Sequence, residues 1–308
     1  MSEAFGKQPE PMNGFRGRVA IVTGAGQGLG RAYAVYFAAR GARVLVNNRR
    51  RTGESSSADQ VVEIIRSAGG EALANHDTVE DPQSGVRMVE QALQAWGRVD
   101  ILVSNAGVEQ HCTFHKIARE DFHKIFAINF FGALYAAHAA YSRMREAGYG
   151  RIVLSTSSAG LHGLHGLSAY ASSKAALIAL TRTLAAEGKS RNVLCNAIAP
   201  YAATRMTARQ DNPEFLATMR PELVSPMVGY LASAQTRLNG EVIVAGKGAF
   251  RRAAMVEGRG YGYASIAQLT EASIERDLER ILDMADAREF PDALTSFNDF
   301  FLAHEGAT

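Results

Sequence analysis

Residues 18–40 limit the possible folds more than any other part of the chain. An apolar run at 18–23 predicts a short strand, and an amphipathic run ending near Arg40 predicts a helix. The turn between them contains, in order, Gly24, Gly26, Gln27, Gly28, Leu29 and Gly30. Glycines at such a turn let backbone N–H groups approach a pyrophosphate, and the helix start adds partial positive charge. The turn predicts a dinucleotide site, although its spacing is not Gly-x-Gly-x-x-Gly; a turn without a ligand is the alternative.

Strands and helices keep alternating after this unit. Residues 43–47, 71–75 and 99–103 predict strands, and residues 58–68 and 82–97 predict the helices that separate them. Such alternation implies a parallel sheet with right-handed crossovers. The fold class is therefore α/β, with a Rossmann-like doubly wound sheet.

The rest of the chain is divided around this sheet. We expect one dinucleotide-binding catalytic domain at 15–250, with a strand at 241–245 closing the sheet. Residues 1–14 read as a loose leader, and residues 251–308 as a helical C-terminal extension. The extension could cover a substrate cleft or pack on a partner subunit, and the sequence leaves both alternatives open.

Polar and small residues follow two of the predicted strands. In doubly wound sheets, ligands lie beyond the carboxyl ends of the strands. Asp77 and Thr78 follow the third strand and are placed for adenine, whereas Asn105, Ala106 and Gly107 follow the fourth and could line the cofactor. Ordinary turn chemistry is the alternative for each of them.

The second strand ends where a dinucleotide fold meets the adenosine ribose. An acidic residue there accepts from the ribose hydroxyls and repels a 2′-phosphate, whereas an arginine attracts one. This chain has Asn48 and Arg49 at that point. We therefore expect NADP(H) rather than NAD(H), with NAD(H) as the alternative because arginine also occurs on exposed turns that bind nothing.

A second constellation lies in residues 155–174. Small hydroxyl residues follow an apolar run at 151–154, and Tyr170 and Lys174 then lie in an alanine-rich run that predicts a helix. At a spacing of four they share one helical face, and a nearby ammonium lowers the pKa of a phenol. Ser157 precedes the tyrosine by 13 residues, so its hydroxyl could meet the same substrate oxygen. Tyr-x-x-x-Lys alone is also the pattern of an ordinary helix face.

Taken in order, the glycine turn, the Asn-Ala-Gly at 105–107, Asn129, Ser157, Tyr170 and Lys174 resemble the short-chain dehydrogenase/reductase family. The resemblance implies hydride transfer between a nicotinamide and a secondary alcohol or ketone. It implies Tyr170 as acid and base, Lys174 on the nicotinamide ribose, and Ser157 as the residue that orients the carbonyl. Asn129 would hold a water that links Lys174 to solvent, and a buried side chain bonded to backbone is the alternative.

A narrower resemblance is to the (3R)-hydroxyacyl-CoA dehydrogenase domain of peroxisomal multifunctional enzymes type 2. Its segments are 24–33, 196–200, 204–207, 220–226 and 269–283. It implies a 3-hydroxyacyl-CoA/3-oxoacyl-CoA pair and cofactor contacts at Pro200, Ala203 and Thr204. The acidic ribose reader of that subfamily is replaced here by Asn48. Other substrates on the same site would be a 3-oxoacyl-carrier-protein, a steroid or a cyclic ketone, and an idle NADP-binding regulator is the alternative outside the enzymes.

Several residues are candidates for substrate contact. His162, His165 and Tyr201 occupy positions that face the substrate in related folds, although two solvated loop histidines are the alternative. Three hydroxyl neighbours compete with Ser157 for the orienting role: Ser155, Thr156 and Ser158. Residues 201–226 are polar and contain prolines, which suits a flexible substrate lid.

Composition argues against other classes of protein. The net charge is +2 with scattered basic residues, which predicts no nucleic-acid partner. No apolar run approaches the roughly 18–20 residues that span a bilayer, and the start lacks the apolar core of a signal peptide. We therefore expect no membrane association and a cytoplasmic location. Alanines and aromatics around 112–145 and 168–187 predict a homodimer or homotetramer.

Sulfur and imidazole ligands are not spaced for a metal. Cys112 and Cys195 lie far apart and read as reduced thiols, and His111 and His115 have no further ligand at zinc spacing. We predict no metal site.

Overall fold

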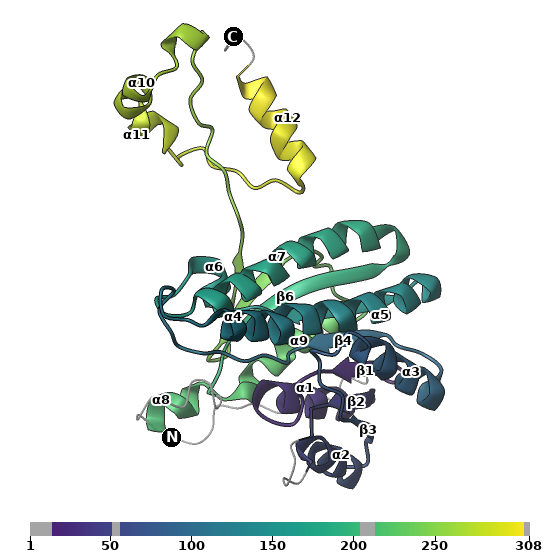
Figure 1. Cartoon of the computed structure of the whole chain (residues 1–308). Coiled ribbons are helices and arrows are strands. Elements are labelled where there is room, and N and C mark those ends of the chain that lie inside the picture. The colour runs from purple at the N-terminus through teal and green to yellow at the C-terminus, as the bar shows by residue number, and fades with distance from the viewer. Residues whose placement is uncertain (1–13, 51–55, 204–212, 305–308) are drawn as a thin grey trace, which may run out of the picture. The chain divides into compact units, whose positions relative to one another are not determined.

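The computed structural model describes residues 14–50, 56–203 and 213–304 (Figure 1). The chain divides into two compact units, Met1–Arg252 and Ala253–Thr308. Nearly all of the expected leader at 1–14 lies outside the described residues. The expected boundary at 250 lies two residues before the division between the units.

The first unit is built on one eight-stranded sheet, in the order β3-β2-β1-β4-β5-β6-β7-β8. The strands are β1 Val19–Val22, β2 Arg43–Asn47, β3 Glu71–Asn75, β4 Ile101–Ser104, β5 Gly150–Ser155, β6 Val193–Tyr201, β7 Val242–Gly246 and β8 Ala249–Ala253. All pairs from β3 to β7 are parallel, which confirms the predicted fold class. The order reverses between β1 and β4, and such a switch point opens a crevice at the carboxyl ends of the strands.

The sequence predicted that the strand at 241–245 closes the sheet, but the sheet continues beyond β7. The chain turns back through Lys247 and Gly248, with φ of 54° and 73°, into the edge strand β8. Two left-handed residues in a two-residue turn suit an antiparallel hairpin. Most of β8 is exposed, so it lacks the buried apolar pattern that predicts a strand.

Helices cover both faces of the sheet. Those of the first unit are α1 Gly28–Ala38, α2 Ser57–Ser67, α3 Ser84–Trp96, α4 Arg119–Phe126, α5 Gly132–Ala147, α6 Ser158–His162, α7 Ser168–Gly188, α8 Pro213–Thr218 and α9 Ser225–Ala232. Shorter turns are the π-helical η1 Ala127–Phe131 and the 3₁₀ turns η2 Lys189–Arg191 and η3 Pro221–Leu223. Within the expected lid, residues 204–212 lie outside the described residues, and the rest contains α8, η3 and the start of α9.

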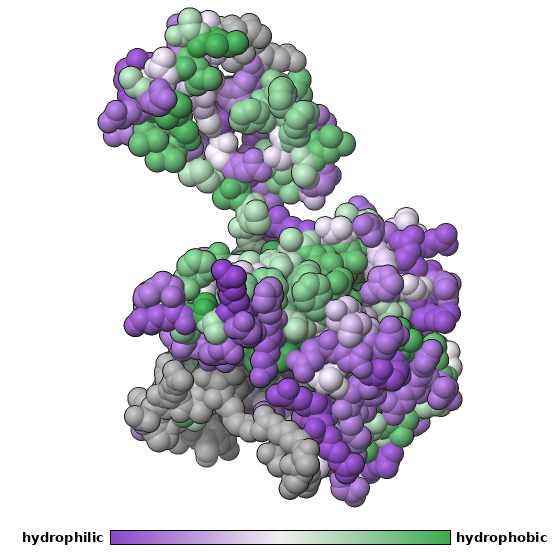
Figure 2. Space-filling view, viewed as in Figure 1, coloured by the Kyte–Doolittle hydropathy of each residue, from purple (hydrophilic) through white to green (hydrophobic). Residues whose placement is uncertain are grey.

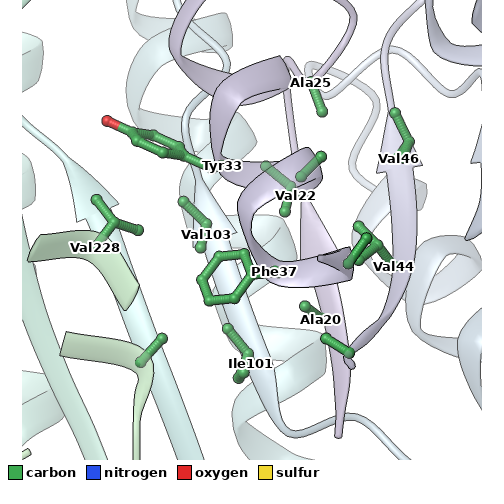
Figure 3. Close-up of a cluster of buried hydrophobic side chains, with 14 of the residues drawn as sticks. Ala20, Val22, Ala25, Tyr33, Phe37, Val44, Val46, Ile101, Val103 and Val228 are labelled. Carbon is green, nitrogen blue, oxygen red and sulfur yellow. The ribbon is translucent and has the colours of Figure 1, made fainter. Parts of the chain in front are cut away.

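Two apolar cores result from the alternation of side chains along each strand. On one face, Val22 lies beneath Tyr33 and Phe37 of α1 (Figure 3). Residues of α2 and α9 belong to the same core. On the other face, Ile21 packs with α3, α5 and α7 around Met144. The central strands β1, β4 and β5 are thus buried on both sides, and the ends of these strands are free to form a site.

The second unit contains η4 Ile266–Gln268, α10 Glu271–Arg276, α11 Leu278–Ile281 and α12 Ala293–Ala303. Polar contacts connect its segments: the backbones of Glu257 and Arg288 exchange two hydrogen bonds of 2.9 Å. The Glu257 carboxylate accepts from Ser296 at 2.9 Å, and Arg288 pairs with Asp299 at 2.8 Å. No helix among the described residues of either unit is both long and apolar enough to cross a membrane.

Candidate active site

A cleft of about 960 Å³ lies at the carboxyl ends of the strands. The predicted site residues that line it are Gly24, Gln27, Gly28, Leu29, Asn48, Arg49, Asp77, Thr78, Asn105, Ala106, Gly107, Ser157, Tyr170, Pro200, Tyr201 and Ala203. Gly26, Gly30, Asn129 and Lys174 do not line it. Thr204 lies outside the described residues. The cleft therefore joins segments that follow several different strands.

The glycine turn packs closely against neighbouring backbone. Gly24 has φ of 62°, and a Cβ there would lie 2.7 Å from the Ala106 Cα atom. A Cβ on Gly30 would collide with the Gly24 carbonyl oxygen. The Thr23 hydroxyl accepts from the backbone N–H groups of Asn105 (3.0 Å) and Ala106 (3.2 Å), which ties the turn to the segment after β4. A side chain at either glycine would collide with neighbouring backbone, so the close packing of this turn requires glycine. A bare backbone turn before a helix start is the arrangement that binds the diphosphate of a dinucleotide.

Asp77 is held rigidly at the edge of the cleft. Its carboxylate accepts from Arg87 Nε at 2.7 Å and from Asn75 Nδ2 at 2.9 Å. Asn75 Oδ1 in turn accepts from Asn47 Nδ2 at 2.7 Å. Asn47 and Asn75 occupy paired positions at the ends of β2 and β3. Sequence reasoning missed this support, and the signal was two asparagines at the carboxyl ends of apolar strands.

Ser157 and Tyr170 are brought together at the other end of the cleft. Ser157 is the N-cap of α6, where its Oγ accepts from the Ala159 N–H at 3.1 Å. Burial raises the pKa of the Tyr170 phenol, the hydrogen bond with Ser157 opposes that rise, and the Glu109 charge adds to it. The net shift is upward because desolvation dominates. The sequence predicted that Lys174 lowers this pKa, and that contribution stays a prediction.

Lys174 lies buried behind Tyr170. Its Nζ donates to the Ser155 carbonyl oxygen at 2.7 Å and lies 5.9 Å from the Tyr170 ring centroid. Burial lowers the pKa of Lys174 to about 8. The ammonium is therefore easier to deprotonate than that of a lysine in water.

Asn129 lies in the π-helical turn η1, between α4 and α5. Its Oδ1 accepts from the Val108 N–H at 2.8 Å, and its Nδ2 donates to the Val108 carbonyl (2.9 Å) and to Ser173 Oγ (3.1 Å). This is the backbone-bonded arrangement that the sequence left as the alternative. A Cβ on Gly107 would lie 3.3 Å from Asn129 Oδ1 and 3.4 Å from Lys174 Nζ, so both side chains support the cleft floor. A water-holding role for Asn129 stays a prediction.

The competing hydroxyl groups have other surroundings. Thr156 Oγ1 donates to the Lys174 carbonyl at 2.7 Å. Ser155 Oγ is buried and has no hydrogen-bond partner among the described residues. Ser158 lines the cleft, as Ser157 does. Of these four side chains, Ser157 is the one whose hydrogen bond affects the pKa of Tyr170.

Part of the cleft lining is apolar. Leu164, Leu167, Leu216 and Met219 line it, and sequence reasoning named none of them. His162 and His165 are exposed and do not line it, which matches the alternative of solvated loop histidines. The loop instead directs its leucines into the cleft.

No group of three potential metal-ligating side chains occurs in the part of the chain that the structure describes. Cys112 and Cys195 are both free thiols. Burial raises the pKa of Cys195 to about 12, so this thiol is inert at neutral pH.

Comparison with known proteins fits this geometry. A family model described as short chain dehydrogenase matches residues 18–214. Peroxisomal multifunctional enzyme A of Dictyostelium discoideum is 45% identical over 239 residues, covering 76% of this chain and 54% of that protein. A 3-oxoacyl-[acyl-carrier-protein] reductase of Synechocystis is 32% identical and covers 76% of this chain and 100% of its own length.

Among solved structures, full-length peroxisomal multifunctional enzyme type 2 from Drosophila melanogaster superposes with a TM-score of 0.80 at 33% identity. The match covers 95% of this chain and 51% of that one. The chain thus spans about half the length of both multifunctional relatives.

Proposed function

Because the chain belongs to the short-chain dehydrogenase family, we propose that it interconverts a 3-hydroxyacyl-CoA and the corresponding 3-oxoacyl-CoA. As a member of the family it is an NAD(P)-dependent oxidoreductase that acts on CH–OH groups of a small molecule. The observation that carries the proposed substrate is the apolar lining by Leu164, Leu167, Leu216 and Met219 of the same cleft that Tyr170 lines. Such a wall suits an acyl chain whose reacting carbon lies near the phenol. Similarity to the multifunctional enzymes supports the same substrate class.

In the proposed mechanism, Tyr170 moves the proton. The nicotinamide, when bound, supplies or accepts the hydride. A phenol whose pKa is raised by burial stays protonated at neutral pH, so Tyr170 can protonate the carbonyl oxygen during reduction. Ser157 would donate a hydrogen bond to the same oxygen and orient the carbonyl.

Lys174 and Asn129 would act behind the phenol. The Lys174 ammonium would place positive charge near Tyr170 and bind the nicotinamide ribose. Asn129 would fix the backbone of Val108 and so the floor of the cleft. Alcohol oxidation requires the deprotonated phenol, so we expect the oxidation rate to rise with pH while the reduction rate falls.

We also propose NADP(H) as the preferred cofactor, with NAD(H) as the alternative. Asn48 lines the cleft at the end of β2, and the exposed Arg49 lines it beside Asn48. An amide does not repel a 2′-phosphate, and a guanidinium attracts one. Dissociation constants for NADPH and NADH test this, and tighter NADH binding would reverse the preference.

A second candidate substrate is a 3-oxoacyl group on a carrier protein. The Synechocystis relative, which the match covers over its whole length, favours it. Steroids and cyclic ketones are further alternatives for the same apolar wall. A 3-oxoacyl-carrier-protein reduced faster than the matching thioester would establish this second candidate.

The decisive experiment follows NADPH and NADH oxidation with 3-oxoacyl-CoA thioesters, the matching carrier-protein ester, steroid ketones and cyclic ketones. Tyr170→Phe should abolish turnover and leave cofactor binding intact, because the phenyl ring keeps the packing and loses the proton. Tyr230→Phe, at a side chain 40% exposed and outside the cleft, is the matched control. Thioester reduction retained in Tyr170→Phe would remove Tyr170 from the mechanism, and activity on free ketones alone would replace the proposed substrate.

We further propose that the chain forms a homodimer or homotetramer. Phe131 is 42% exposed at the end of η1, and exposed aromatic side chains are enriched at subunit interfaces. Light scattering coupled to size-exclusion chromatography measures the mass, and a monomer at micromolar concentration would rule out the proposal.

A further inference from the structure

Two neutral side chains meet at the adenosine end of the cleft. Asn48 Nδ2, at the end of β2, donates to Ser57 Oγ, at the start of α2, at 2.7 Å. Both residues line the cleft beside Arg49. A Cβ on Gly26 would lie 2.7 Å from Asn48 Nδ2 and would collide with Ser57 Oγ. The pair therefore packs directly against the glycine turn.

The direction of this hydrogen bond decides what the pair can offer a ligand. A hydroxyl can accept and donate at the same time. Ser57 Oγ accepts from the amide, and no residue in the described parts of the chain accepts its proton. Asn48 Oδ1 likewise has no donor among the described residues. The Asn48–Ser57 pair therefore offers a ligand one hydroxyl donor and one carbonyl acceptor.

The helix itself does not need the Ser57 hydroxyl. Ser56 caps α2, because its Oγ accepts from the Asp59 N–H at 3.2 Å. Ser56 Oγ also contacts His76 Nδ1 at 3.3 Å. Since the neighbouring serine satisfies the helix start, the half-buried hydroxyl of Ser57 is available for another partner.

We propose that Ser57, oriented by Asn48, is a specificity-determining residue that donates to the 2′-phosphate of NADP(H). The proposal rests on the proposed NADP(H) preference and assigns it to a neutral donor besides Arg49. A hydroxyl that donates to a phosphate oxygen contributes most when the acceptor is charged. Without the 2′-phosphate, the Ser57 proton has water as its partner.

The test uses two cofactor fragments and the chain of 308 residues. Calorimetry gives dissociation constants for adenosine 2′,5′-bisphosphate and adenosine 5′-monophosphate, which differ only in the 2′-phosphate. Ser57→Ala should weaken the bisphosphate about tenfold and change the monophosphate less than about twofold. Ser67→Ala, on an exposed hydroxyl at the far end of the same helix, is the matched control and should change neither.

Asn48→Asp provides an independent readout. A carboxylate there would accept a hydrogen bond from the Ser57 hydroxyl and repel the 2′-phosphate. The bisphosphate should therefore bind more weakly while the monophosphate keeps its affinity. If Ser57→Ala weakens the binding of both fragments equally, Ser57 makes no specific contact with the 2′-phosphate, and the inference is overturned.

The outcomes separate the two proposals. If the unmodified chain does not discriminate between the fragments, the NADP(H) preference fails and the role of Ser57 fails with it. If the unmodified chain prefers the bisphosphate and Ser57→Ala keeps that preference, only the role of Ser57 is overturned.

Discussion

In the unit that ends at Arg252, large apolar side chains are buried between a sheet and its helices, whereas in the unit that begins at Ala253 they lie at the surface. Phe37 of α1 is 0% exposed, and Phe300 of α12 is 58% exposed. The buried side chains described in the second unit are polar, Ser273 and Asp277. Figure 2 shows hydrophobic residues at the surface of this second unit, which contains α10 to α12.

The difference teaches that the two units are stabilised by different interactions. Burial of apolar surface is the dominant favourable term in the first unit. The second relies on polar contacts: Asp277 accepts from Arg276 at 2.8 Å, and the Arg280 guanidinium lies 3.8 Å from the Tyr261 ring centroid. An isolated helix as short as α12 is marginal in water. Its exposed apolar residues are Leu294, Phe297, Phe300, Phe301 and Leu302, and such a surface is typical of an interface.

The largest expected effect is the difference between replacing a phenylalanine by alanine in the first unit and doing so in the second. Phe37→Ala should lower the free energy of unfolding by about 3–5 kcal/mol, because it removes buried contacts and leaves a cavity. Phe300→Ala should change it by less than about 0.5 kcal/mol when measured on the monomer. Urea unfolding curves give both values. Similar losses for the two variants would contradict the contrast.

The next effect depends on the buried charge of Lys174. Burial lowers its pKa from the ordinary lysine value of 10.5 to about 8, so the unfolded chain binds more protons between these two values. This group therefore makes stability rise with pH from about 8 to about 10.5. In Lys174→Met that contribution should vanish. The Lys174 contribution is measured by comparing the urea midpoints of the variant and the unmodified chain between neutral and alkaline pH. If the two midpoints change with pH in parallel, the assignment to Lys174 is refuted.

A smaller effect should follow from an unpaired hydroxyl in the first core. Tyr33 is fully buried, and its hydroxyl has no partner among the described residues. Tyr33→Phe should therefore stabilise the first unit by about 1 kcal/mol. Tyr141→Phe is the matched control with the opposite sign, because its hydroxyl donates to the Leu184 carbonyl at 3.2 Å. Thermal unfolding measures both, and a loss in Tyr33→Phe would reveal an unseen partner.

The last effect should be confined to the second unit. Ser273 completes a capping box at the start of α10, where its Oγ accepts from the Thr270 N–H at 3.0 Å. Ser273→Ala should weaken this local structure by about 1 kcal/mol. Amide hydrogen exchange should quicken in α10 and stay unchanged in the core strands. Faster exchange in β1 or β4 would show that the units unfold together.

The sequence predicted the parts of the fold that periodicity determines. Residues 71–75 were predicted as a strand and form β3, because a short apolar run bounded by turn residues marks such strands. β8 was missed because an exposed edge strand has no apolar period. The π-helical turn around Asn129 was missed because its residues continue the pattern of the neighbouring helix.

The candidate site was predictable where spacing along one element decides the geometry. Tyr170 and Lys174 lie on one helix, and Ser157 lies within reach of the tyrosine. The direction of the pKa shift at Tyr170 was not predictable, because burial depends on segments distant in sequence. Ser57 was missed because a serine beside a helix start ordinarily reads as part of a cap.

The hydrogen bonds of Asn129 also bear on the order of events during folding. This one amide connects Val108, 21 residues before it, with Ser173, 44 residues after it. The central pair β1 and β4 likewise joins residues about 80 positions apart, and such distant pairings form slowly. We therefore expect the ability to bind a nucleotide to return last during refolding, so that its recovery measures completion of the native state rather than collapse.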